Sequence, residues 1–166
     1  MRQDRFLIGI LAGIGLLVVL SLAVFFMRRG TQNYGPEDTP EGVLQNYVVA
    51  LQRGDYPRAY RYVADFANKP DLPLFQQPFV NYQQRDLSLT GVEIGSTSLS
   101  ADGKTALVYL VLLHTGNGPF NQGYRETNTA TLELSGGVWK ISMMPYPFWI
   151  YDWNQPTLEA KPAPGG

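Results

Sequence analysis

The chain has 166 residues, a formal net charge of −1 and no cysteine. Its length suffices for one domain with a hydrophobic core plus attachments. The lack of cysteine excludes disulfides, thiolate zinc sites, iron–sulfur ligation and C-x-x-C-H haem attachment. After residue 29, nine basic residues stand against thirteen acidic ones, a balance that argues against nucleic-acid binding.

The first element is an apolar run, FLIGILAGIGLLVVLSLAVFFM, from Phe6 to Met27. Its 22 residues would form about 33 Å of helix, enough to cross a bilayer core of about 30 Å. A cleaved signal peptide would have a shorter apolar core and a small-residue cleavage site, whereas this run ends in FFMRRG. The sequence therefore predicts a transmembrane anchor with basic flanks over residues 1–29, in contact with lipid through residues 6–27.

Two arginines flank this run on each side, so charge alone barely sets its orientation. The free N-terminus favours a cytoplasmic start, and we expect a single-pass protein of a bacterial inner membrane with its domain outside the cytoplasm. Gly9 and Gly13 form a G-x-x-x-G pattern, which lets another helix approach closely. The pattern predicts packing against other membrane-protein subunits, although glycine is also common in membrane helices without such a role.

A linker and three helices are predicted next. Residues 30–38 are polar and rich in turn formers, which is typical of a linker. Thr39 provides an N-cap and Pro40 suits the first helical position. Apolar residues recur at helical spacing over residues 43–51, and two further helical segments follow, one after Asp55 and one within residues 72–84.

The apolar period changes from helix to strand at Leu87. A phase slip at Gly91 indicates a β-bulge, and the dipeptide at 102–103, Asp-Gly, marks a hairpin turn. Residues 105–115, TALVYLVLLHT, are apolar on both faces, and two further strands follow a wider turn at 117–123. Helices followed by antiparallel strands predict an α+β domain of three helices on a curved sheet of about four strands.

The segment TPEGVLQNYVVALQRGDYPRAYRYVADF, the three predicted helices, the bulged strand and the closing GGVWKI together resemble the nuclear transport factor 2-like superfamily. The resemblance covers residues 39–144. It implies a cone-like domain in which a curved sheet wraps around helices. The superfamily contains enzymes, ligand-binding modules and scaffolds, so the fold by itself does not define the function.

Enzymes of this superfamily use Asp, Tyr or His inside the cone, and the resemblance makes Tyr60, Tyr62, Tyr109 and His114 the pocket candidates. His114 is the only histidine and ends the most apolar strand, where a structural role is more common than catalysis. One histidine among scattered carboxylates offers no metal-ligand spacing. The sequence therefore predicts no catalytic residue, no metal and no cofactor.

The stretch MMPYPFWIYDW, residues 143–153, places five large aromatic residues after the last predicted strand. The strand at 105–115 needs covers on both faces, and this stretch is one available cover. Three interpretations of this stretch remain: it folds back onto its own domain, it docks on another subunit, or it contacts the membrane interface. We assign residues 145–154 as an aromatic docking extension and 155–166 as a flexible tail. The docking candidates are Tyr146, Phe148, Trp149, Tyr151 and Trp153.

These features favour a non-catalytic accessory or scaffold subunit of a multi-subunit bacterial membrane complex, acting by helix packing and periplasmic-side docking. The layout resembles the small single-span subunits of electron-transport complexes such as alternative complex III, and also the inner-membrane scaffold proteins of type IV secretion. The alternative is a membrane-tethered small-molecule-binding domain or enzyme that uses the cone pocket. It predicts an open cavity lined by Tyr, Asp or His, whereas a scaffold predicts a pocket filled by Tyr47, Phe79 and Trp139.

Overall fold

The computed structural model describes residues 3–28, 33–116 and 122–154. The chain divides between Asn33 and Tyr34 into an N-terminal helical unit and a C-terminal domain. The predictions for residues 29–32, 117–121 and 155–166 lie outside the described residues. They concern part of the linker, most of the wide turn and the tail.

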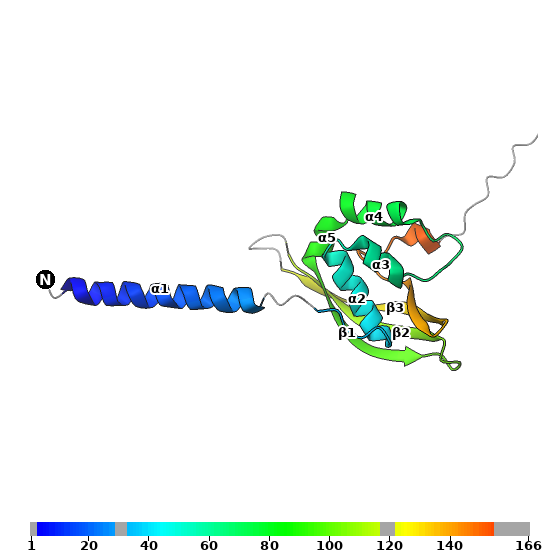
Figure 1. The fold of residues 1–166 in the computed structure, drawn as a ribbon, viewed down its shortest axis with the longest axis horizontal. Helices are drawn as coiled ribbons and strands as arrows, with labels where there is room; N and C mark the ends of the chain where they lie inside the picture. The colour runs from blue at the N-terminus through cyan, green and yellow to red at the C-terminus, as the bar shows by residue number, and fades with distance from the viewer. Residues whose placement is uncertain (1–2, 29–32, 117–121, 155–166) are drawn as a thin grey trace, which may run out of the picture. The chain divides into compact units, whose positions relative to one another are not determined.

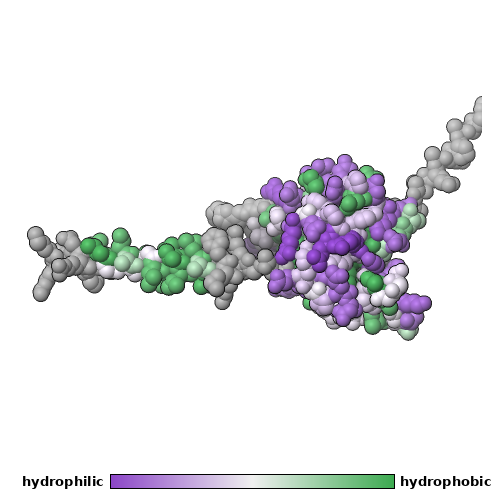
Figure 2. Space-filling view, viewed as in Figure 1, coloured by the Kyte–Doolittle hydropathy of each residue, from purple (hydrophilic) through white to green (hydrophobic). Residues whose placement is uncertain are grey.

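The N-terminal unit is a single helix, α1 (Gln3–Arg28). Its segment Leu7–Val24 is long and apolar enough to cross a membrane, by length and composition. Figure 2 shows hydrophobic residues along this helix, and their side chains are exposed. A side chain added at Gly9 or Gly13 would meet no other atom, so the predicted helix-packing role of these glycines remains a prediction.

Four α-helices open the domain: α2 (Pro40–Gln52), α3 (Tyr56–Tyr62), α4 (Leu72–Asn81) and α5 (Gln84–Leu89). The predicted N-caps are present. Thr39 Oγ1 accepts a hydrogen bond from Gly42 N at 3.2 Å, and Asp55 Oδ1 accepts one from Arg58 N at 3.2 Å. Helix α5 replaces the predicted start of the first strand. Leu87 and Leu89 are separated by one residue, and a pattern this short is compatible with either a strand or a helix. In the fold, Leu87 enters the core from the short helix.

The four strands form one antiparallel sheet in the order β1-β2-β3-β4, which confirms the predicted α+β class. They are β1 (Thr90–Leu99), β2 (Thr105–His114), β3 (Tyr124–Ser135) and β4 (Val138–Met143). The pairing of β1 with β2 shifts between Ile94 and Thr97, so the bulge lies later than the predicted Gly91. Gly95 lies within this shift, where a Cβ would come within 3.1 Å of the Tyr109 carbonyl oxygen, so the close approach of the two strands favours glycine.

The helices cover one face of the sheet, here called the inner face, and the sheet curves around α2 (Figure 1). Alternate residues of β2 and β3 point from this face into the core: Ala106, Val108, Leu110, Leu112, Ala130 and Leu132. Tyr47, Phe79 and Trp139 are also buried there. The centre of the domain is therefore filled by large side chains.

The aromatic segment after β4 folds back onto its own domain. Phe148, Trp149 and Trp153 are buried, and Trp153 stacks on Phe75 of α4 with ring centroids 5.2 Å apart. Tyr47 Oη donates a hydrogen bond to the Phe148 carbonyl at 2.7 Å. This corrects the assignment of the three buried residues as surface docking residues, because the core removes their apolar rings from water without a partner.

Two of the five predicted docking residues, Tyr146 and Tyr151, are exposed. The outer face of β2 also remains uncovered within the described residues, since Leu107 and Tyr109 are 40% and 45% exposed. The aromatic segment therefore does not cover the outer face of β2, although the sequence suggested that it could.

The end of the predicted linker belongs to the domain. The Arg58 guanidinium carbon lies 3.3 Å from the centre of the Tyr34 ring. Gly35 N donates to Asn46 Oδ1 at 2.6 Å, and Asn46 Nδ2 donates to the Gly35 carbonyl at 3.1 Å. These contacts attach residues 34–38 to α2 and α3, so the domain begins before the predicted residue 39.

Candidate functional site

The inner face of the sheet changes from apolar to polar toward the C-terminal end of β2. Directly paired residues of antiparallel strands project to the same face. Three rows across β1, β2 and β3 lie in succession on this face: Ile94–Leu110–Asn128, Val92–Leu112–Glu126 and Thr90–His114–Tyr124. The face that carries the core at Leu110 thus continues into amide, carboxylate and imidazole groups.

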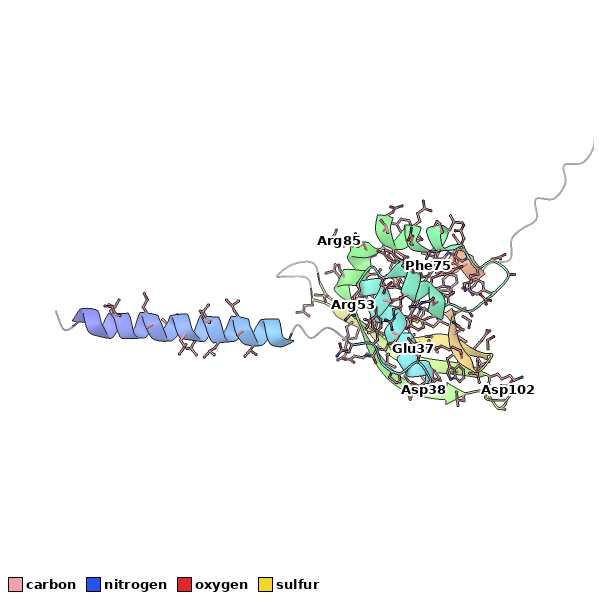
Figure 3. The ribbon with its side chains drawn as sticks, in the orientation of Figure 1. Glu37, Asp38, Arg53, Phe75, Arg85 and Asp102 are labelled. Carbon is pink, nitrogen blue, oxygen red and sulfur yellow. The ribbon has the colours of Figure 1, made fainter. Side chains whose placement is uncertain are left out.

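This polar end lines a cavity of about 560 Å³. Helix α5, the start of β1, the end of β2, the start of β3 and the segment after β4 contribute its wall. Phe75 points into the filled interior elsewhere in the domain, whereas Arg85 of α5 lies at the surface (Figure 3). The residues that line the cavity are distinct from those of the buried cluster that contains Phe75.

His114 lies at the centre of the polar wall. Its Nδ1 is 3.2 Å from Oγ1 of the buried Thr90, and its ring stacks on Tyr124 with centroids 4.3 Å apart. Its Nε2 is 3.5 Å from Glu126 Oε2, an ion pair when the imidazole is protonated. This distance is too long for a hydrogen bond of ordinary strength.

Two buried polar atoms beside the cavity lack a hydrogen-bond partner among the described residues, namely His114 Nε2 and Asn128 Nδ2. A buried polar atom without a partner destabilises a protein by about 1–3 kcal/mol. Both atoms belong to residues that line the cavity. A polar guest would gain a hydrogen bond from either of them after a small movement of its side chain.

Tyr146 and Asp86 join the two sides of the cavity wall. The Tyr146 hydroxyl donates a hydrogen bond to Asp86 Oδ2, which connects the segment after β4 to α5. This hydrogen bond, together with partial burial, raises the pKa of Tyr146 to about 12. The phenol is therefore neutral at physiological pH and serves as a donor.

Of the four predicted pocket residues, His114 lines the cavity and the three tyrosines do not. Tyr60 Oη donates to a backbone carbonyl at 2.8 Å, and Tyr62 Oη donates to Glu37 Oε1 at 2.6 Å. Both phenols therefore attach neighbouring loops. Tyr109 lies on the outer face of the sheet, because it alternates with buried residues of β2.

Sequence reasoning missed Asp86, Thr90, Glu126, Asn128 and Tyr146 as cavity residues. One signal was available, since Asn128 shares its strand face with two apolar residues, Ala130 and Leu132. A polar residue in an otherwise apolar row is informative when it is buried. The contributions of α5 and of the segment after β4 had no comparable signal, because they depend on the tertiary fold.

Among residues 3–28, 33–116 and 122–154, no three His, Asp or Glu side chains gather closely enough to hold a metal ion. The hydrogen-bonding groups of the polar wall lie singly, in successive rows of paired residues along the strands. Such groups can donate and accept hydrogen bonds, and the imidazole of His114 can also transfer a proton.

No protein-family model and no curated protein matches the chain. Several solved structures are similar. A SEC-C motif containing protein from Rhodopseudomonas palustris is 12% identical with a TM-score of 0.47, and the match covers 64% of this chain and 77% of that one. A proposed polyketide cyclase from Xanthomonas campestris is 16% identical with a TM-score of 0.37, covering 61% and 86%.

A proposed dehydratase of the NTF2-like family from Streptomyces avermitilis is 15% identical with a TM-score of 0.36, covering 62% of this chain and 93% of that one. The similar structures thus include NTF2-like proteins. At TM-scores below 0.5 they do not decide membership of the superfamily, which remains a prediction, and they carry no information on function.

Proposed function

We propose that the domain is a membrane-tethered binding domain that takes a small molecule into the cavity around His114. This is the alternative function expected from the sequence. The observation that carries it is a cavity of about 560 Å³ with two unpartnered polar atoms in its wall, counted over the described residues. Cavities of about 300–1,000 Å³ with a few convergent polar groups are typical of small-molecule sites.

Helix α1 would tether this domain to a bacterial inner membrane, with the domain outside the cytoplasm. The length and apolar composition of Leu7–Val24 support a membrane span. The side of the membrane follows from the weak preference of the free N-terminus for the cytoplasm.

The test is a thermal-shift screen of small metabolites against the full-length protein in dodecyl maltoside micelles. A specific ligand present at 100 times its dissociation constant stabilises the domain by about 2.7 kcal/mol. The substitution Thr115→Trp should block the cavity with a large side chain, because Thr115 is exposed and lines the cavity. The matched control is Thr127→Trp, an exposed threonine on the outer face of β3.

We expect stabilisation of the wild type and of Thr127→Trp and none of Thr115→Trp. Equal stabilisation of all three would place the ligand elsewhere and overturn the proposal. Turnover of a bound compound would extend the function to an enzyme of this pocket.

A second candidate function is the accessory subunit. It is favoured by the exposed apolar row on the outer face of β2, where Leu107 and Tyr109 are accompanied by the half-buried Val111 and Leu113. We propose that another subunit of a membrane complex covers this face. Purification of the tagged full-length protein in mild detergent, followed by mass spectrometry, tests it.

In that experiment Leu107→Glu should release a stoichiometric partner, and Gln84→Glu, which adds the same charge at an exposed position of α5 away from this face, should retain it. A partner that survives Leu107→Glu, or a clean monomer from the wild type, would contradict docking through this face.

A further inference from the structure

The cavity wall is acidic. Its ionisable groups include two carboxylates, Asp86 and Glu126, together with His114, and none of its described residues is lysine or arginine. Residues 117–121, next to this wall in the sequence, contain no charged residue either. After residue 29 the chain has thirteen acidic and nine basic residues. The cavity therefore has a negative potential whenever His114 is neutral.

Among the described residues, no lysine or arginine forms an ion pair with Asp86 or Glu126. Arg125 adjoins Glu126 in the sequence but points to the outer face of the sheet, where its Nη2 lies 2.6 Å from Glu93 Oε2. Within the described residues Asp86 forms no ion pair and accepts its hydrogen bond from Tyr146. Asp86 is therefore available to a cation that enters, and Glu126 is available as well whenever His114 is neutral.

Aromatic rings add a second attraction for a cation. Tyr124, Tyr146 and Tyr151 line the cavity and are 61%, 56% and 75% exposed. His114 stacks on one side of the Tyr124 ring, which leaves the opposite side to be approached. A cation within about 6 Å of a tyrosine ring is attracted by its electron-rich face.

We propose that the ligand is a small organic cation, an amine or quaternary ammonium compound that also carries a hydrogen-bond acceptor; this rests on the proposed binding function. The ammonium group contacts Glu126, Asp86 and the tyrosine rings. The acceptor group receives the hydrogen bond of Asn128 Nδ2, a buried donor without a partner among the described residues, once this amide turns toward the cavity that Asn128 lines. The same ammonium chemistry occurs in free amines and in lipid headgroups.

The experiment is calorimetric titration of the full-length protein in dodecyl maltoside micelles at low salt. The probe is choline, and the matched control is 3,3-dimethylbutan-1-ol, in which a carbon atom replaces the charged nitrogen. We expect choline to bind about tenfold more tightly than the alcohol, and the difference to shrink in high salt. Glycerophosphocholine represents the lipid headgroup and should bind less tightly than choline, because its phosphate meets the cavity carboxylates.

Two variants localise the effect. Glu126→Gln should weaken choline binding by about fivefold to tenfold and leave binding of the alcohol unchanged. Glu93→Gln removes a carboxylate of similar exposure, 54% against 51% for the Glu126 side chain, from the outer face. It should change choline binding by less than about twofold.

The outcomes separate this inference from the function on which it rests. Equal affinities for choline and the alcohol would overturn the cationic ligand, and so would an anionic compound that binds more tightly than either. If Thr115→Trp abolishes that binding, the binding function is left standing. The absence of any compound that distinguishes Thr115→Trp from Thr127→Trp would overturn both. Tighter binding of glycerophosphocholine than of choline would retain the cation and assign it to a lipid headgroup.

Discussion

The inner face of the sheet has two ends that differ in chemistry although the same strands build both. At the filled end, Ala130 and Leu132 of β3 are fully buried in the core that also holds Phe75 and Trp153. At the open end, Asn128 and Glu126 continue the same strand face and line a cavity. Alternation along a strand decides which face a residue occupies, whereas the elements packed above it decide whether it contacts a core or a ligand site.

The aromatic rings account for this difference. Trp149 and Trp153 meet at 5.0 Å between ring centroids, and Phe75 and Phe79 at 5.3 Å, and all four rings belong to the buried cluster that contains Ala130 and Leu132. At the open end, the cavity next to Asn128 is lined instead by three exposed tyrosines, Tyr124, Tyr146 and Tyr151. Burial of large apolar groups stabilises one end, and the other end retains the polar groups that a dry core would exclude.

The substitution Trp153→Ala removes a buried ring from the filled end, and we expect it to lower the free energy of unfolding more than any other variant proposed. Removal of a buried tryptophan should destabilise the domain by about 3–5 kcal/mol, through lost burial and the cavity that remains. Chemical denaturation followed by circular dichroism measures the change. Tyr151→Ala, at a neighbouring exposed position, is the control and should stay within about 0.5 kcal/mol. Equal effects of the two would show that Trp153 is not part of the core.

Tyr47→Phe tests the attachment of the aromatic segment to α2. The substitution keeps the ring but leaves the buried Phe148 carbonyl without the hydroxyl that donates to it at 2.7 Å. The expected destabilisation is about 1–3 kcal/mol. Tyr56→Phe, at a tyrosine that packs against the core from its edge, is the comparison in the same denaturation experiment. An unchanged free energy of unfolding in Tyr47→Phe would contradict the role of this hydrogen bond.

Asn128→Leu would make the open end resemble the filled end. It removes a buried donor that lacks a partner among the described residues and adds apolar area, so we expect stabilisation by about 1 kcal/mol. The same variant should lose ligand binding. Thr129→Leu, on the outer face of the same strand, should leave both properties nearly unchanged. Destabilisation by Asn128→Leu would mean that the amide is already satisfied, for example by water.

The hydrogen bond from Tyr146 to Asp86 gives the smallest effect, a loss of stability at alkaline pH. The pKa of Tyr146 is about 12 in the folded domain, above its usual value of 10. The unfolded chain releases this proton first, so the stabilisation is complete below pH 10 and is lost as pH rises through 12. Thermal unfolding across this range should show the decline.

Tyr146→Phe should lessen this decline but not abolish it. Tyr47 and Tyr62 also have raised pKa values, in both cases chiefly because of burial, and they contribute with the same sign. A decline of equal slope in the variant would contradict the contribution of Tyr146.

Local physical chemistry was sufficient to predict much of this protein from its sequence. The apolar run predicted α1, and the capping residues Thr39 and Asp55 predicted where α2 and α3 begin. The Asp102-Gly103 turn is present, with a φ of 67° at Gly103, a backbone angle that glycine adopts without strain. Alternation identified the buried residues of β2. Each of these features depends on residues close together in the chain.

The tertiary structure alone decided the position of the bulge, the short helix α5, the burial of the aromatic segment and the cavity. Tyr47 and the Phe148 carbonyl, which together hold the aromatic segment in place, lie 101 residues apart. The wall around His114 likewise combines α5, three strands and the segment after β4. Local patterns carry no information about which distant groups meet, because that depends on how the whole domain buries its apolar surface.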